Sequence, residues 1–292
     1  MPLDSNIFQL NTNLTDNMFG DIPEAIDFDV EFQPTRMAGK NYVVNKNTDD
    51  VIGIVGKTYP HNPHPEYFKE VQNAIAENLS ANDLAGADVR WKTARWGAFA
   101  LMDITLPNVR YPITTKKHQT DVAQRIVALH GVDGLCSNQV YFGAIDSFCT
   151  NGNITGDWGK VRRKNTSNFS LEKFIQELNE AKTDFHEHGR MLQTWADRET
   201  NLHDVRYTLA SIMKSDRLAK KMSDLYLAEA NTRGHNVFAL YSAMTNYATY
   251  ADERNGFKLK KSDNDNEAIN MFGREQHVSQ WISHPAFKVL AA

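Results

Sequence analysis

The chain has 292 residues, of which 41% are hydrophobic and 23% are charged, as is typical of a soluble globular protein. No apolar run approaches the ~20 residues that a membrane-spanning helix needs, and the N-terminus lacks the cationic start and apolar stretch of a secretory signal. Two cysteines, Cys136 and Cys149, exclude a four-cysteine zinc site and a disulfide scaffold. We therefore expect a cytoplasmic protein with reduced thiols and no membrane partner.

The first half of the sequence has the patterns of β structure. Residues 1–27 mix polar residues with isolated apolar ones, which indicates an N-terminal arm. Residues 41–60 predict a hairpin, because two β-branched runs flank the turn-forming stretch NKNTDD. A helix is expected over 65–79, where a proline precedes apolar residues at helical spacing. Further strands are predicted within 87–106 and 124–154.

The second half has helical periodicity. Residues 170–185 place their apolar side chains on one stripe, and the next residues, FHEHG, predict a helix end at Gly189 with His186 and His188 on its surface. The helical pattern continues to about residue 250, with breaks expected at KSD and RGHN.

Strands followed by helices predict an α+β fold rather than a doubly wound α/β fold. We expect an antiparallel or mixed sheet with one helix in the N-terminal half and a helical C-terminal half. The predicted organisation is an arm at 1–27, a β-rich core at 28–165 and a helical region at 166–292 that packs on the same core.

No recognised catalytic or phosphate-binding motif occurs in the chain, which lacks Walker, GxGxxG, GxSxG and HExxH sequences. The best metal candidates are His61, His64 and Glu66, but three prolines make this stretch an extended turn, so we expect no metal. Cys149 is interpreted as a packing residue rather than a nucleophile. The sequence therefore predicts neither catalytic residues nor a cofactor.

Charge is distributed unevenly along the chain. Residues 1–88 contain 5 Lys+Arg and 14 Asp+Glu, a net charge of −9, whereas residues 89–164 contain 11 and 5, a net charge of +6. A cationic surface attracts polyanions. The alternative, that the acidic first segment neutralises the basic middle segment, remains open at this point.

The middle segment combines cations with aromatic residues, as proteins that bind single strands do: cations neutralise phosphates and aromatic rings stack on bases. Trp91 and Trp96 are interpreted as core residues, whereas Trp158 is the predicted stacking residue. The predicted nucleic-acid-binding residues are Arg90, Lys92, Arg95, Lys116, Lys117, Trp158, Lys160, Arg162, Arg163 and Lys164. We expect them to form one continuous track.

Two stretches, SFCTNGN (147–153) and ANTRGHNVFALYSAMTNYATYAD (230–252), resemble the phage/plasmid-like family catalogued as a domain of unknown function, number 932. The resemblance covers about residues 40–275. Phe238 and Ser242 stand where that family usually has Trp and Asn. The matching residues are Gly53, Val55 and Tyr59 in an early strand, Cys149 and Asn151 after a later strand, and Phe238, Ala243, Thr245 and Tyr247 in a late helix.

The resemblance implies a protein of phage or mobile-element replication and recombination. By analogy of fold order alone, it is similar to the ring-forming single-strand annealing proteins of phages. We expect a protein that binds single-stranded nucleic acid without sequence specificity and acts as a homo-oligomer. In its most specific form, the expectation is that this protein anneals strands. The alternative is a non-enzymatic structural or scaffolding protein of a phage particle or replisome, and a weaker third option is a metal-dependent nuclease.

Overall fold

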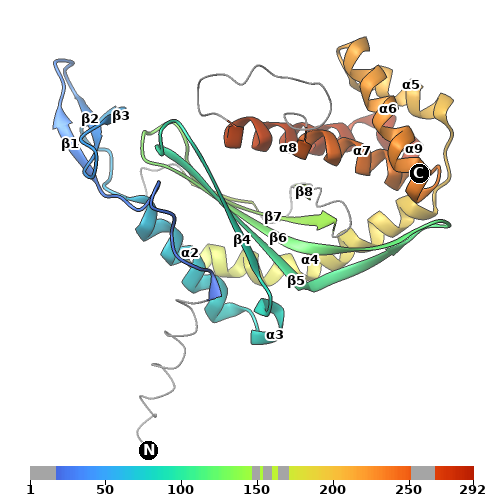
Figure 1. The fold of residues 1–292 in the computed structure, drawn as a ribbon, viewed down its shortest axis with the longest axis horizontal. Coiled ribbons are helices and arrows are strands. Elements are labelled where there is room, and N and C mark those ends of the chain that lie inside the picture. The colour runs from blue at the N-terminus through green and yellow to red at the C-terminus, as the bar shows by residue number, and fades with distance from the viewer. Residues whose placement is uncertain (1–17, 147–151, 154–159, 164–170, 251–266) are drawn as a thin grey trace, which may run out of the picture.

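The computed structural model describes residues 18–146, 152–153, 160–163, 171–250 and 267–292. Two antiparallel sheets occupy the first half of the chain and helices the second half (Figure 1), which confirms the predicted α+β class. Cys149, Trp158, Lys164, residues 1–17 and the turn that leads into the predicted basic run lie outside the described residues. In the described part, no helix has both the length and the apolar character required to cross a bilayer.

The large sheet is an antiparallel meander of four main strands, with two short strands at one edge. Its strand order is β4-β5-β6-β7, and both β8 and β9 pair with β7. The bounds are β4 Asp88–Ala94, β5 Phe99–Thr114, β6 Gln119–Gly131, β7 Asn138–Asp146, β8 Gly152–Asn153 and β9 Lys160–Arg163.

The β5–β6 hairpin extends well beyond β4. Because β4 begins opposite Thr105, the rest of β5 has only one strand neighbour, and this free side tolerates Pro107 and Pro112, which lack an N–H. The register shifts between Leu106 and Arg110. At this bulge Asn108 Nδ2 donates to the Asn82 carbonyl within the short helix α3 (Ala81–Leu84) and to the carbonyl of Ala85, which caps its C-terminus.

One face of the large sheet packs on α2 (His64–Asn78) and α4 (Leu171–Asp197). Ile104, Ile126 and Phe142 are opposite one another on successive strands, so they form one fully buried row. The Phe142 ring stacks on Phe174 of α4 at 6.2 Å. The strand alternation thus supplies the sheet side of the main core, and α2 confirms the helix predicted at 65–79.

The opposite face of the large sheet is covered by α8 (Glu267–Ser283), which lies above it in Figure 1. Leu101, Leu129 and Tyr141 bury their side chains with Ala268 and Met271 of this helix in a separate core. The sheet is therefore a central layer with helices on both faces. This arrangement explains why β6 is buried without interruption from residue 122 to residue 131 instead of alternating between buried and exposed positions.

The remaining helices are α5 (Leu202–Ile212), α6 (Asp216–Arg233), α7 (Val237–Tyr250) and α9 (Pro285–Ala291). They pack on one another and meet α4 through α7 and α9. Trp195 of α4 contacts Tyr241 and Phe287 with ring centroids 5.4 and 5.1 Å apart. The breaks predicted at KSD and RGHN are confirmed, and Ser215 caps α6 by accepting a hydrogen bond from the Leu218 N–H.

The second, small sheet consists of β1 (Val30–Pro34), β2 (Lys40–Asn45) and β3 (Val51–Gly56), in that order. It confirms the hairpin predicted at 41–60 and stands at the end of the large sheet that is distant from α5, α6 and α9 (Figure 1). A Cβ atom on Gly53 would lie 2.7 Å from Asp133 Cβ, so the glycine permits the close approach that joins the two sheets.

Three expectations from the sequence are wrong. The helix does not end at Gly189, because this glycine lets α4 pass against Tyr111, whose ring would lie 2.3 Å from any Cβ there. His188 is consequently buried rather than on the surface. Trp96 is 76% exposed instead of core, because Arg95, Trp96 and Gly97 all have positive φ and turn the tryptophan outward.

Candidate functional site

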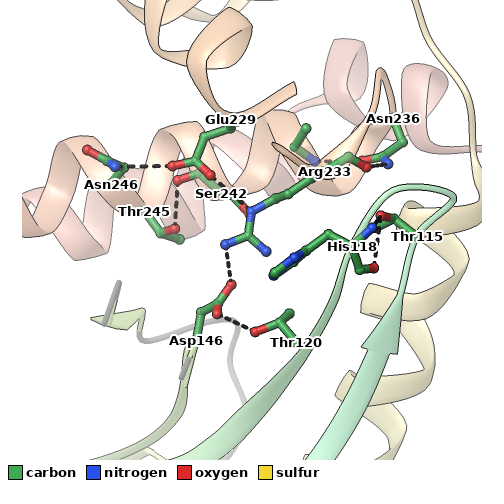
Figure 2. Close-up of polar contacts among 11 residues, drawn as sticks. Thr115, His118, Thr120, Asp146, Glu229, Arg233, Asn236, Ser242, Thr245 and Asn246 are labelled. Carbon is green, nitrogen blue, oxygen red and sulfur yellow. Dashed lines mark hydrogen bonds and ion pairs between the residues drawn. The ribbon is translucent and has the colours of Figure 1, made fainter. Parts of the chain in front are cut away.

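The most polar part of the interior surrounds Arg233, the last residue of α6, which has no solvent exposure (Figure 2). Its Nη2 atom lies 2.8 Å from Asp146 Oδ2 at the end of β7, and its Nε atom donates to Glu229 Oε2 at 2.9 Å. The guanidinium carbon also lies 5.2 Å from the centre of the Phe238 ring. One arginine thus connects the large sheet to α6 and α7.

A second set of polar groups holds the two carboxylates of this network. Thr120 on β6 donates to Asp146 Oδ1 at 2.8 Å, and Asn246 on α7 donates to Glu229 Oε1 at 3.1 Å. In Figure 2 the side chain of His118, from the β5–β6 turn, points toward Arg233. All these groups are fixed by neighbours, which suits a rigid structural junction.

The Arg233 network connects the second stretch of the family resemblance, residues 230–252, to the strand end that precedes the first. Asp146 directly precedes SFCTNGN, and Arg233, Phe238 and Thr245 belong to the 230–252 stretch. Segments nearly 90 residues apart in the sequence therefore meet through the Arg233–Asp146 ion pair. Two surface hollows of the described part, one on α4 and one beside Trp96, are lined by other residues. Because its charged groups are held by one another, the network has the geometry of a structural junction.

A scan against family models matches residues 51–284 to the family described as Domain of unknown function (DUF932). The chain belongs to this family. No curated protein and no solved structure matches it. The match covers most of the chain, so it includes β3, the large sheet and every described helix except α9.

This DUF932 protein contains a second buried ion network, on the opposite face of the large sheet. Arg125 on β6 forms a bidentate pair with Asp103 on β5, with both distances 2.7 Å, and its Nη1 donates to Glu275 of α8 at 2.8 Å. Burial raises the pKa of Glu275, and the attraction of Arg125 and of the predicted site residue Lys92 opposes this rise. The Lys92 Nζ lies 3.2 Å from Met271 Sδ, so α8 partly covers this lysine.

A pair of histidines is buried beneath the β4–β5 turn. His64 Nε2 donates to the Gly97 carbonyl at 2.8 Å, so the neutral His64 ring accepts at Nδ1 from His130 Nδ1, also at 2.8 Å. Burial lowers the pKa of His64 to about 4 and that of His130 well below its usual value, with the charge of His64 lowering it further. Both rings are therefore neutral at physiological pH.

The metal candidates from the sequence are separated in the structure. His61 is exposed beside Asp29, at 2.7 Å, whereas His64 belongs to the buried pair. Among the described residues, no group of three or more His, Cys, Asp or Glu side chains could hold a metal ion.

Three of the predicted nucleic-acid-binding cations have carboxylate partners. Arg90 pairs with Asp88 at 2.7 Å, and Arg95 Nε lies 2.6 Å from Asp133 Oδ2. Lys116 pairs with Glu199 of the α4–α5 connection. Lys117 is exposed on the same β5–β6 turn as Lys116. Of these three carboxylates only Asp88 belongs to residues 1–88, so the ion pairs do not amount to the neutralisation by the acidic first segment that the sequence left open.

The predicted site residues are also dispersed over the large sheet. Arg90 and Lys92 lie on edge strand β4, whereas β9, which contains Lys160, Arg162 and Arg163, is at the opposite edge beyond β7. Four strand spacings of about 4.8 Å separate these edges by roughly 19 Å. The described members therefore do not form the expected continuous track, and Trp158 and Lys164 lie outside the described residues.

Exposed cations that the sequence prediction did not include occur around the connection between α5 and α6. Four of them, together with a tyrosine that is 73% exposed, lie within fifteen residues of the chain. We name this surface the corner patch; it consists of Arg206, Tyr207, Lys214, Arg217 and Lys220. Within the described part of the chain, none of its four cations forms an ion pair. The stretch KSDRLAKK is rich in cations and could have revealed this surface. It was overlooked because the acidic residues of the second half balance these cations in the net charge of that segment.

Proposed function

We propose that this protein binds single-stranded nucleic acid without sequence specificity and acts as a homo-oligomer. In its most specific form, the proposal is that the protein anneals complementary strands. The observation that carries the proposal is the corner patch. Residues 203–221 contain five Lys+Arg and two Asp+Glu, a net charge of +3. Unpaired cations can neutralise phosphates, and an exposed aromatic ring offers a base a stacking surface worth about 1–3 kcal/mol.

The helix geometry favours the same use of this surface. A three-residue connection, Met213 to Ser215, joins α5 to α6, and its exposed Lys214 stands between the cations of the two helices. The basic run of β9 would supply a second contact, as the sequence predicts. A phage or mobile-element setting is part of the proposal and comes from the resemblance alone.

Fluorescence polarisation with labelled oligonucleotides tests the proposal. We expect a single strand to bind at low salt, more tightly than a duplex of the same length, and we expect the affinity to fall linearly with the logarithm of the salt concentration. No binding at low salt would refute the proposal. Preference for the duplex would point to groove recognition by α6 and would refute the single-strand form.

Light scattering with and without the oligonucleotide distinguishes the scaffolding alternative. The observation that favours this alternative is the exposed apolar edge of the small sheet, through which copies of the protein could assemble. Association that is indifferent to nucleic acid, together with no retention on it, would support a structural protein over the proposed function.

A further inference from the structure

The exposed apolar side chains of the protein gather at one end. Eight large hydrophobic side chains are exposed in the described part of the chain, and five of them lie on the small sheet or on the loops that it contacts. We name these five the edge patch: Met37, Val51, Ile54, Trp96 and Leu135. Exposed apolar side chains that gather in one region are a common mark of an interaction site on a soluble protein.

The edge patch includes a free sheet edge. Strand β3 is the last strand of the small sheet, and among the described residues its backbone pairs only with β2. Its sequence, VIGIVG, has no charge and no proline. Val51 is 55% exposed and Ile54 is 45% exposed.

The other sheet edges are protected against such pairing. Strand β1 carries Glu31 and ends at Pro34, β4 carries Asp88, Arg90 and Lys92, and β9 has the sequence KVRR. Charged residues and proline are the usual means of preventing edge-to-edge association. An unprotected, exposed apolar edge is therefore a template for another strand.

We infer that a second copy of this chain pairs its β3 with this β3, antiparallel and about a two-fold axis, so that the two small sheets become one six-stranded sheet. Charge complementarity favours a second copy of this chain as the partner of β3. Lys57 follows β3, and Asp49 and Asp50 precede it, so the strand is cationic at one end and acidic at the other. Pairing centred on Gly53 or Ile54 places Lys57 of each copy beside the acidic turn of the other.

The neighbouring surface fits a partner as well. Trp96 borders a groove of about 850 Å³ that also contains Asp50, Val51 and Ile52 at the start of β3. The Arg95–Asp133 ion pair and the positive φ values of this turn keep the tryptophan outside the core. Large aromatic side chains of this kind are frequent anchors of interfaces.

This inference specifies the oligomer of the proposed function but does not depend on nucleic-acid binding, so it is tested without nucleic acid. Sedimentation velocity of the full chain should show a dimer that dissociates on dilution. Ile54→Lys should be a monomer, whereas the matched control Val289→Lys, on exposed α9, should dimerise as the wild type does. A monomeric wild type, or an Ile54→Lys dimer, would overturn the inference.

A charge exchange tests the register. Lys57→Asp should raise the dimer dissociation constant about tenfold, because two ion pairs become repulsive contacts. Adding Asp49→Lys and Asp50→Lys to the same chain should restore dimerisation. Failure of the restored chain to dimerise would exclude the proposed antiparallel pairing.

Cross-linking keeps the inference testable if Ile54→Lys does not fold. Ile54→Cys should give a covalent dimer with a short bismaleimide, and wild type and Val289→Cys should not. Cross-linking no greater than in these controls would overturn the inference, including the case in which residues 1–17 of the same chain cover β3.

Discussion

The interior and the corner patch contain the same kinds of side chain in opposite situations. Arg233 and Arg125 each face two carboxylates in the core, whereas the four cations of the corner patch have no ion-pair partner among the described residues. A buried, paired arginine stabilises the junction of two elements, and an exposed, unpaired one remains available to a polyanion. The comparison shows that the pairing of a cation, rather than its presence, decides its role.

The largest effect is expected from removing one of the buried, paired arginines. Arg233→Ala leaves Asp146 and Glu229 as buried carboxylates without their cation, so it should lower the free energy of unfolding by about 3–5 kcal/mol. Arg217→Ala, on the corner patch, should change it by less than about 0.5 kcal/mol. Urea unfolding of both variants measures the difference, and equal effects would contradict the contrast between the two regions.

The next effect concerns pH and the buried histidines. Burial lowers the pKa of His64 to about 4 and that of His188 to about 3. An unfolded histidine binds its proton near pH 6.5, so the unfolded state gains protons first and stability is lost as the pH falls from 6.5 toward 4. The pKa shift of His64 alone should lower the free energy of unfolding by about 3 kcal/mol over this window.

Urea midpoints measured between pH 7 and pH 5 test this expectation. His188→Gln should make stability less dependent on pH, because a titrating group has been removed. The control His203→Gln, whose histidine side chain is 90% exposed, should leave the dependence unchanged. A stability that is constant over this range would show that the buried rings do not titrate as the structure implies.

A smaller effect tests the close packing of α4 on the β5–β6 hairpin. Gly189→Ala should destabilise the protein by about 1–3 kcal/mol, because the new Cβ would overlap the Tyr111 ring. In a Tyr111→Ala background the same change should stabilise it by about 0.5–1 kcal/mol, since alanine is the better helix former. A double-mutant cycle by thermal unfolding detects this change of sign. The same sign in both backgrounds would exclude the packing explanation.

The smallest effect is expected at the exposed Lys116–Glu199 ion pair. Lys116→Ala should leave the free energy of unfolding nearly unchanged, and any loss should shrink further in high salt because both side chains are exposed. Unfolding at low and high salt measures it. A loss similar to that of Arg233→Ala would contradict the distinction between surface and interior pairs.

The sequence predicted the features of this fold that depend on neighbouring residues. The β2–β3 hairpin, helix α2 and the helix breaks at KSD and RGHN all follow from local turn, cap and periodicity signals. The end expected at Gly189 was wrong because a local helix-stop signal was overridden by packing on Tyr111, far away in sequence. Local signals thus predicted helices and strands, but not the tertiary contacts that can override such signals.

The pairing of charges was beyond the sequence for the same reason. Arg95 meets a carboxylate 38 residues away, Lys116 one that is 83 residues away, and Arg125 one that is 150 residues away. No spacing rule connects such positions, so cations that appeared free in the sequence are paired in the structure. The corner patch is different: three of its cations are close in sequence, and it was missed because the acidic residues of the second half bring the net charge of residues 165–292 to −1.

The most direct test of the account is the salt dependence of single-strand binding by a corner-patch variant. Arg217→Ala with Lys220→Ala should weaken binding and reduce the slope of log affinity against log salt by about 1.4, which corresponds to two lost phosphate contacts. The matched control, Lys116→Ala with Arg90→Ala, removes two cations that already have carboxylate partners and should leave the slope nearly unchanged. An unchanged slope in the corner-patch variant, or an equal reduction in the control, would contradict the account.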